Sequence, residues 1–355
     1  MRIAIANDTP MAVEALRRVV LSVPEHEIIW VAENGQQAVE LAMQNLPDLI
    51  LMDLIMPVLD GVQATSQIMQ QSPCAILVVT SCVTDNSGKV FDAMGAGAMD
   101  AVNTPVLVVN DDTDGAGDLL KKIYTMGLLL NHKTRHSTKT SAPVNRPAQH
   151  NNRLLVIGAS TGGPKALATL LAEFPLNFPV PIVIVQHVDK QFVQGLADWL
   201  NDQTTLPVQL AVEDDRLEAG TVYVADSDRH LQISTSGKLF YQDEPKHYIH
   251  KPSVSVLFES VAQNWVGQAI GVLLTGMGKD GAAGLLAMRD HGFFTVAQDE
   301  ESCAVYGMPK MAVKLDAAEI VLSLNEIGPA LRKLFAPGAM SQDTISPGTI
   351  SGAAS

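Results

Sequence analysis

Residues 154–171 read LLVIGASTGGPKALATLL and join an apolar run, a glycine-rich turn and a helical pattern. The apolar residues 154–157 predict a buried strand, and from Lys165 to Leu171 the apolar residues recur at helical spacing. Pro164 suits the first helical position, where its missing N–H and fixed φ carry no penalty. A strand followed at once by a helix is typical of βα units, so this stretch indicates an α/β domain with a parallel sheet.

The alternation of short apolar runs with amphipathic stretches continues on both sides of this turn. Over residues 153–335 it predicts a doubly wound parallel α/β domain, and over residues 1–130 a flavodoxin-like (βα)5 domain. The further strands expected in the C-terminal domain are 182–185, 221–224, 269–274 and 295–297. In the N-terminal domain the expected strands are 3–6, 27–32, 49–52, 76–79 and 100–102, and the expected helices are 11–20, 36–44, 62–70, 89–94 and 118–130.

Two segments lack the large apolar residues that a packed core requires. Residues 131–152 carry Lys and Arg but no Asp or Glu, and residues 336–355 are rich in Gly, Ser, Pro and Thr. Such compositions cannot bury enough apolar surface to offset the entropy of ordering the chain. We therefore expect a flexible basic linker at 131–152 and a disordered tail at 336–355.

The composition restricts the class of protein. The chain has 355 residues, 47% of them hydrophobic, which suits two globular domains. A net charge of −14 would repel polyanions, so nucleic acid is not an expected partner. No apolar run approaches the roughly 18 residues of a membrane span, and polar residues follow the first strand too early for a signal peptide. Three widely spaced cysteines without a CxxC pattern favour a reducing cytosol, so we expect a cytoplasmic protein without membrane insertion.

Three polar residues follow expected strands of the N-terminal domain. Asp8 comes after the first strand, Asp53 after the third and Thr80 after the fourth. Because the carboxyl ends of parallel strands meet at one edge of the sheet, these side chains should lie close together. A carboxylate there can act as a nucleophile toward a phosphoryl group, and Mg²⁺ favours one or two carboxylates plus phosphate oxygens. The alternative is that the two acids only cap strand-to-helix turns.

A second group of polar residues follows expected strands of the C-terminal domain. Residues 158–162, GASTG, fit the GxSxG turn that exposes a serine hydroxyl above a sheet, and the helix that follows presents N–H groups suited to an oxyanion. A serine nucleophile needs a base, and the base needs an orienting group. His187 directly ends an apolar strand and Asp280 lies just past another. Ser160, His187 and Asp280 are therefore the candidate nucleophile, general base and orienting acid.

Other interpretations of these residues stay open. A single histidine more often has a structural or surface role, and Asp280 could cap the helix expected at 282–288. The glycine-rich turn could bind a dinucleotide, but the G-x-G-x-x-G fingerprint needs glycine where Ser160 stands. A phospho-switched transcription factor is opposed by the acidic charge and by the lack of a compact basic helix-turn-helix pattern. The order Ser, His, Asp also differs from the Ser, acid, His order of α/β-hydrolases.

The segment MDLIMPVLDG at residues 52–61 resembles the phospho-acceptor motif of bacterial response-regulator receivers. The resemblance covers the first 130 or so residues and implies Asp53 as the phospho-acceptor, with a histidine kinase as phosphodonor. It also implies Asp8 and Asp53 as ligands of Mg²⁺ and Thr80 as the switch hydroxyl.

Two positions depart from the receiver pattern. Asn7 stands where the family usually has the first of two adjacent acids, and Thr104 precedes Pro105 where the family usually has lysine. A missing carboxylate weakens a magnesium site, and a missing cation weakens charge compensation around a phosphoryl group. We therefore expect slower or weaker phosphorylation than the family pattern would give.

The chain as far as about residue 335 is similar to the chemotaxis protein-glutamate methylesterase family, CheB. The motifs that carry the resemblance are IGASTGGP at 157–164, QH at 186–187, HKPSVSVLF at 250–258, LLTGMGKDGAAG at 273–284 and QDEESCAVYGMP at 298–309. The resemblance implies the roles given above for Ser160, His187 and Asp280. It further implies active-site neighbours at Thr161 and Gly162 and an oxyanion donor at the Met277 N–H.

The family resemblance also implies an activity. Its members hydrolyse glutamate methyl esters on methyl-accepting chemoreceptors, which yields glutamate and methanol, and some also deamidate glutamine. Ester hydrolysis by this mechanism needs no cofactor, whereas phosphorylation of the receiver needs Mg²⁺ and would shift the domain equilibrium toward activity. AVNTP at 101–105 and QHVD at 186–189 resemble a Wsp-type, surface-sensing branch, and Ser255 stands where the family often has Asp.

Overall fold

The computed structural model describes residues 1–80, 87–107, 113–130, 152–226, 228–248 and 250–336. Apart from residues 152 and 336, the expected linker and tail lie outside the described residues. The chain divides into two compact units, Met1–Ser137 and Thr138–Ser355. Each unit has its own parallel sheet and is described by itself.

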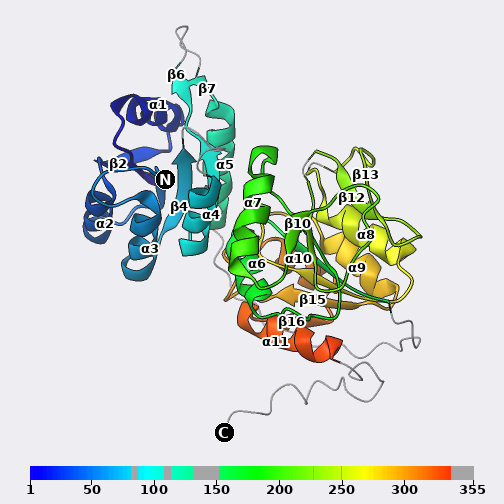
Figure 1. Cartoon of the computed structure of the whole chain (residues 1–355). Coiled ribbons are helices and arrows are strands. Elements are labelled where there is room, and N and C mark those ends of the chain that lie inside the picture. The colour runs from blue at the N-terminus through cyan, green and yellow to red at the C-terminus, as the bar shows by residue number, and fades with distance from the viewer. Residues whose placement is uncertain (81–86, 108–112, 131–151, 227, 249, 337–355) are drawn as a thin grey trace. The chain divides into compact units, whose positions relative to one another are not determined.

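The first unit is a five-stranded parallel sheet in the order β2-β1-β3-β4-β5, with helices around it (Figure 1). This is the flavodoxin-like order expected from the alternating pattern. The strands are β1 (Arg2–Ala6), β2 (Glu27–Ala32), β3 (Leu49–Met52), β4 (Ala75–Thr80) and β5 (Asp100–Asn103). The helices are α1 (Pro10–Leu21), α2 (Gly35–Gln44), α3 (Gly61–Gln71), α4 (Ser87–Ala96) and α5 (Ala116–Leu130). Helix α1 packs against α5, and α2, α3 and α4 pack in succession.

The central strands of this sheet carry continuous apolar runs because helices cover both of their faces. Every residue of β3 and β4 is buried, and Leu51 is paired with Ile5 on one side and Leu77 on the other. This parallel register brings the strand ends to one edge, where Asp53 begins the loop after β3. A short antiparallel ribbon, β6 (Val106–Leu107) and β7 (Thr113–Asp114), follows β5 and was not expected from the sequence.

The second unit is a seven-stranded parallel sheet in the order β10-β11-β9-β8-β14-β15-β16. Its strands are β8 (Arg153–Ala159), β9 (Ile182–Gln186), β10 (Val208–Leu210), β11 (Val222–Val224), β14 (Gln268–Leu273), β15 (Phe294–Gln298) and β16 (Ile320–Leu322). A separate antiparallel hairpin is formed by β12 (His230–Ile233) and β13 (Leu239–Gln242). The three-residue strands β10 and β16 and the hairpin are additions to the expected set, because elements this short give little periodic signal.

Two groups of helices flank this sheet (Figure 1). One group packs as α11 on α6 and α6 on α7, and the other as α8 on α9 and α9 on α10. The helices are α6 (Gly163–Ala172), α7 (Lys190–Gln203), α8 (Val254–Asn264), α9 (Ala282–Asp290), α10 (Met308–Lys314) and α11 (Leu324–Phe335). Pro164 is the second residue of α6, one position later than expected but still in the first turn.

The strand order of this sheet identifies where a site should form. From β8 the chain proceeds to β9 on one side, and it later returns to β14 on the other side of β8. The order therefore reverses between β8 and β14. In open parallel sheets, ligands bind in the crevice outside the carboxyl ends of the strands at such a point.

Candidate active site and receiver site

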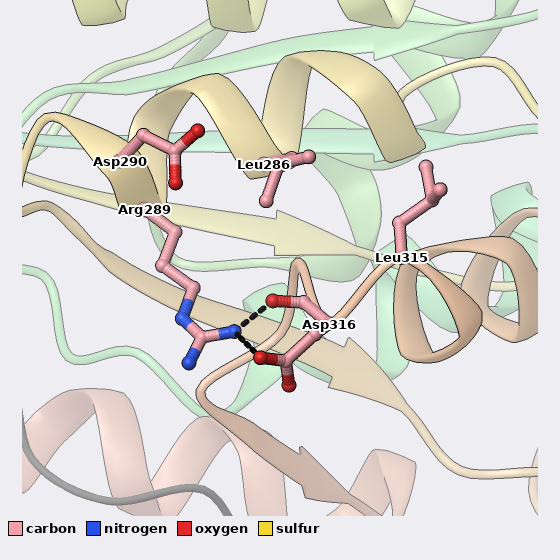
Figure 2. Close-up of a pocket in the computed structure, with 5 residues that line it drawn as sticks. All are labelled: Leu286, Arg289, Asp290, Leu315 and Asp316. Carbon is pink, nitrogen blue, oxygen red and sulfur yellow. Dashed lines mark hydrogen bonds and ion pairs between the residues drawn. The ribbon is translucent and has the colours of Figure 1, made fainter.

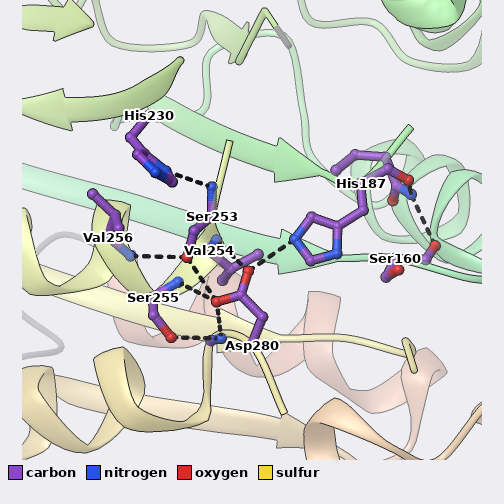
Figure 3. A network of polar contacts seen from close by, with 10 residues as sticks. Ser160, His187, His230, Ser253, Val254, Ser255, Val256 and Asp280 are labelled. Carbon is purple, nitrogen blue, oxygen red and sulfur yellow. Dashed lines mark hydrogen bonds and ion pairs between the residues drawn. The ribbon is translucent and has the colours of Figure 1, made fainter. Parts of the chain in front are cut away.

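The carboxyl ends of β8, β9 and β14 bring Ser160, His187 and Asp280 together at this reversal point (Figure 3). Ser160 directly follows β8, and His187 directly follows β9. Asp280 lies in the loop from β14 to α9. Residues that are up to 120 positions apart in the sequence thus meet because their strands are neighbours in one sheet.

The turn at Ser160 is held by backbone contacts that leave its hydroxyl uncommitted. The Ser160 N–H donates to the Thr275 carbonyl at 3.0 Å, and the Ser160 carbonyl accepts from Gln186 Nε2 at 2.8 Å and from the Gly163 N–H at 2.7 Å. The Ser160 Oγ bonds to none of the described residues. The turn therefore fixes the backbone and leaves Oγ available to a substrate.

Two glycines are required by the close packing around this serine. Gly162 has a φ of +75°, and a Cβ there would lie 2.4 Å from the Cβ of Ala304. A Cβ on Gly276 would lie 2.7 Å from the Cβ of Ser160. The loop after β14 and the segment that carries Ala304 therefore run directly against the turn at Ser160, and a side chain at either glycine would displace its neighbour.

His187 and Asp280 form the best-defined polar contact of the site. His187 Nε2 lies 2.8 Å from Asp280 Oδ2, and the side chains are only 9% and 8% exposed. A carboxylate can only accept, so Nε2 carries the proton and Nδ1 is left as the acceptor of the neutral ring. Nδ1 is buried and has no partner among the described residues. Ser160 lies on the side of the imidazole away from Asp280 (Figure 3), so Nδ1 is the atom placed to take a proton from Ser160.

Asp280 rests on the N-terminus of α8, where unpaired backbone N–H groups favour a negative charge. Its carboxylate accepts from the Val254 N–H at 2.8 Å, the Ser255 N–H at 3.1 Å and the hydroxyl of Ser253 at 2.7 Å. Its Oδ1 also accepts from the Gly281 N–H at 2.9 Å. The N-terminus of α8 thus holds the candidate orienting acid in place, by contacts that the spacing of residues in the sequence did not reveal.

These contacts determine the protonation state of Asp280. Burial alone would raise the pKa of Asp280, but the hydrogen bonds from His187, Ser253 and the α8 backbone outweigh it and hold the pKa below its usual value. Asp280 is therefore ionised at neutral pH and can stabilise an imidazolium at His187.

The remaining predicted neighbours lie beside the serine. The Thr161 carbonyl accepts from Thr275 Oγ1 at 3.0 Å, which joins the turn at Ser160 to the loop after β14. Met277 follows Gly276, whose carbonyl accepts from the N–H groups of Gly307 and Met308. The Met277 N–H bonds to no described residue, as an oxyanion donor requires in a resting site.

One aromatic neighbour of the site was not identified from the sequence. The exposed His250 stacks on His187, with ring centroids 4.2 Å apart and an interplanar angle of 18°. Its ring covers one face of the candidate base. His250 is the first residue of the motif at 250–258. However, no rule of sequence spacing places a loop histidine beside the end of a strand.

In the receiver unit, the predicted residues stand at the carboxyl edge of the sheet. Asp53 follows β3 and its N–H donates to the Ala6 carbonyl, while Thr80 ends β4 and is 1% exposed. Burial is the main cause that raises the pKa of Asp53 from 3.8 to about 6, and the charge of Asp8 adds to it. A bound cation would relieve both effects, so the two carboxylates fit a Mg²⁺ site. Among the described residues, no group of three or more His, Cys, Asp or Glu is arranged to hold a metal ion. With Asp8 and Asp53 as its protein carboxylates, Mg²⁺ would take its other ligands from phosphate, water or backbone oxygens.

We expect Asp53→Asn to stabilise the receiver unit at pH 7.5 by roughly 1 kcal/mol, allowing for partial exposure of the carboxyl. A carboxyl whose pKa is raised in the folded state binds its proton more tightly there, so its ionisation destabilises the fold at neutral pH. That penalty fades as the pH falls through about 6 toward 3.8, so the two proteins should converge near pH 4. Calorimetry of the full chain at both pH values measures this difference, and Mg²⁺ at pH 7.5 should raise the melting temperature of the wild type only. Equal melting at pH 7.5 would contradict the shifted pKa.

A second prediction concerns the two departures from the receiver pattern. Asn7 is 2% exposed and its Oδ1 accepts from the Thr9 N–H at 2.8 Å, while the Thr104 N–H donates to the Thr80 carbonyl at 2.9 Å. An aspartate at position 7 can keep its bond and add a magnesium ligand, and a lysine at 104 adds a cation beside the switch position. We expect the double variant Asn7→Asp, Thr104→Lys to raise the phosphorylated fraction several-fold at fixed phosphodonor and saturating Mg²⁺.

Phosphate incorporation into wild type, the double variant and Asp53→Asn tests this expectation. The Asp53→Asn protein is the blank. Equal labelling of wild type and double variant would contradict the prediction that the missing carboxylate and cation weaken phosphorylation. Labelling that survives Asp53→Asn would exclude Asp53 as the acceptor.

A shallow pocket in the second unit lies apart from these residues (Figure 2). It is lined by Leu286, Arg289, Asp290, Leu315 and Asp316. Arg289 pairs with Asp316 across it, with Nη1 and Oδ2 2.8 Å apart. This pocket lies at the C-terminal end of α9, whereas Asp280 precedes the N-terminal end, so it is no part of the candidate site. Within the described ranges, no helix is both long and apolar enough to cross a bilayer.

Comparisons with known proteins agree with both units. A family model described as CheB methylesterase matches residues 155–331, and one described as response regulator receiver domain matches residues 3–110. The chain is 52% identical to the protein-glutamate methylesterase/protein-glutamine glutaminase 1 of Bordetella avium, over 96% of this chain and 98% of that protein. It is 48% identical to the protein-glutamate methylesterase/protein-glutamine glutaminase 3 of Pseudomonas aeruginosa, over 94% of this chain and all of that protein. The crystal structure of the Thermotoga maritima CheB methylesterase catalytic domain is similar to it, with a TM-score of 0.50 and 36% identity over 52% of this chain and 98% of that one.

Proposed function

This chain belongs to the CheB methylesterase family with an N-terminal receiver domain, and from that membership we propose that it hydrolyses glutamate methyl esters on chemoreceptor-type signalling proteins and releases methanol. The observation that carries the proposal is the convergence of Ser160, His187 and Asp280 at the sheet's reversal point. The names of these relatives support the reaction, and the geometry supports how it is performed.

The proposed reaction begins when Ser160 Oγ attacks the ester carbonyl. His187 Nδ1 takes the Oγ proton, and the ionised Asp280 holds Nε2–H and stabilises the imidazolium. The tetrahedral oxyanion is held by backbone N–H groups, among which that of Met277 is free to donate, and one such donor is typically worth about 10²- to 10³-fold in rate. His187 returns the proton to the leaving methoxide, which departs as methanol. Water then attacks the acyl carbonyl while His187 Nδ1 takes a proton from it. His187 returns that proton to Ser160 Oγ as the bond between the acyl carbon and Oγ breaks, which releases glutamate.

The receiver supplies the control in this proposal. Asp53 would accept a phosphoryl group from a histidine kinase, with Asp8 and Asp53 as the protein ligands of Mg²⁺ and Thr80 donating its hydroxyl to a phosphoryl oxygen. Phosphorylation would shift the chain toward its active state, as receiver domains do. We place the reaction in the cytoplasm, which suits the free thiols of Cys74 and Cys303 and the kinase partner.

Two other output functions are less well supported. A dinucleotide loop would need glycine at position 160, where the structure has a serine facing a hydrogen-bonded His–Asp pair. A transcriptional output would need a DNA-binding surface, and the second unit matches a methylesterase model over residues 155–331. The relatives' names include glutaminase, so we include receptor glutamine deamidation, which uses the same serine chemistry with ammonia as the leaving group.

Methanol release from a methylated chemoreceptor cytoplasmic fragment tests the proposal. The full chain should release methanol, and more of it with Mg²⁺ and a small-molecule phosphodonor. The control is Ser160→Ala under the same conditions. Absence of methanol from the wild type, with or without phosphodonor, would contradict the proposed function.

A further inference from the structure

A buried histidine is linked to the candidate triad through Ser253 and has no part in the reaction described above. His230 begins β12 and is completely buried. Its Nδ1 accepts a hydrogen bond from the Ser253 N–H at 3.1 Å (Figure 3). A backbone N–H can only donate, so His230 Nδ1 is unprotonated and the neutral ring carries its proton on Nε2.

The surroundings of this ring keep it neutral. Burial lowers the pKa of His230 and the charge of Lys251 lowers it further, while the Pro245 carbonyl, Asp280 and Asp243 act in the opposite direction with smaller effect. A neutral ring with a fixed tautomer is a rigid acceptor. The acceptor therefore stays available to the Ser253 N–H at neutral pH.

Ser253 connects this histidine to the orienting acid. Its hydroxyl donates to Asp280 Oδ1 at 2.7 Å and accepts from the Val256 N–H at 3.4 Å, which makes it the N-cap of α8. The two N–H groups that follow, of Val254 and Ser255, also bind Asp280. The position of Ser253 thus decides where three of the donors to Asp280 lie.

We propose that His230 is a positioning residue of the catalytic centre: its Nδ1 fixes Ser253, which together with the first turn of α8 seats Asp280. Asp280 in turn holds His187 with Nδ1 toward Ser160. Four residues from four segments of the unit, His230, Ser253, Asp280 and His187, form one chain of hydrogen bonds, in which His230 is the member farthest from the reacting atoms. This inference rests on the proposed function for its kinetic test.

The competing explanation is that His230 only packs the core, and the same strand offers a matched control. Gln232 lies two positions along β12, on the same face, and is 9% exposed with an Nε2 that has no partner among the described residues. Replacing either residue with leucine removes a buried polar group from β12. Only His230→Leu also removes the acceptor of the Ser253 N–H.

The decisive comparison uses the full chain and three variants, His230→Leu, His230→Asn and Gln232→Leu. The asparagine Oδ1 can occupy the place of Nδ1 and accept the same N–H, so it should rescue. We expect His230→Leu to lower kcat for methanol release by about 10- to 100-fold with KM within twofold, the size of loss seen when a hydrogen-bond partner that orients a metal ligand is removed. His230→Asn should recover most of that loss, and Gln232→Leu should keep kcat within twofold.

A readout independent of turnover separates this inference from the proposed function. The proton between His187 Nε2 and Asp280 should give a downfield proton resonance in the wild type, His230→Asn and Gln232→Leu, and that resonance should broaden or vanish in His230→Leu. An inactive wild type would count against the proposed function, while the resonance would still test His230. If His230→Leu does not fold, His230→Ala replaces it, since alanine also removes the acceptor of the Ser253 N–H and should lower kcat similarly. A folded His230→Leu that matches Gln232→Leu in kcat, or that keeps the resonance, overturns the proposal, as does an asparagine variant no better than leucine.

Discussion

Replacing Ser160 with alanine is expected to lower kcat for methanol release by at least roughly 10⁴-fold, because loss of the nucleophile in a serine hydrolase leaves only oxyanion and binding contributions. Stability should barely change. The Ser160 Oγ bonds to no described residue, and the backbone contacts to Thr275 and Gln186 do not involve the hydroxyl. Methanol release and the melting temperature of the full chain measure the two effects together.

The combination with His187→Ala tests whether the residues act as one unit. Each single change should cost nearly the full effect, and the double variant should be no slower than Ser160→Ala alone. If the double variant were instead slower by the product of the two single effects, His187 would act independently of Ser160. The base would then have to be sought elsewhere. If Ser160→Ala kept activity within about tenfold of wild type, the serine mechanism itself would be wrong.

Parallel strands explain why the residues of the candidate site could be proposed from the sequence. A parallel strand buried on both faces reads as a continuous apolar run, so residues 154–157 and 182–185 mark their strands clearly. The polar residue that ends each run must then lie at the carboxyl edge. This is how Ser160, His187 and Asp53 could be identified as candidates without knowing the order of the strands.

The residues that hold the candidate catalytic side chains in position could not be predicted in the same way. Which nitrogen of His187 faces Ser160 depends on a side-chain torsion set by Asp280 and by the N-terminus of α8. His230 and His250 come from a short antiparallel hairpin and from an irregular loop, neither of which has a period that points to a sheet edge. Contacts of this kind follow from packing, which no pattern of spacing in one sequence encodes.

Asp280→Asn should lower kcat by about 10³- to 10⁴-fold, because the acid fixes the tautomer of the base. The wild-type carboxylate only accepts: Oδ2 from His187 Nε2 and the Val254 N–H, and Oδ1 from three further donors. An asparagine must turn its NH₂ to one of these sides. If the NH₂ faces His187, it donates to Nε2, so Nε2 must be unprotonated. The ring proton then moves to Nδ1, which can no longer take a proton from Ser160.

The other orientation of the amide is no better for the protein. There the NH₂ would face the N–H groups of Ser255 and Gly281, and unsatisfied buried donors cost about 1–3 kcal/mol of stability. Asp290→Asn, on the exposed end of the same helix α9, is the matched control and should change neither kcat nor the melting temperature. Steady-state kinetics and thermal melts of the two variants separate the cases. A tautomer effect lowers kcat with little loss of stability, whereas a displaced α8 N-terminus lowers both. Asp280→Asn activity within tenfold of the control would show that the carboxylate does not orient the base.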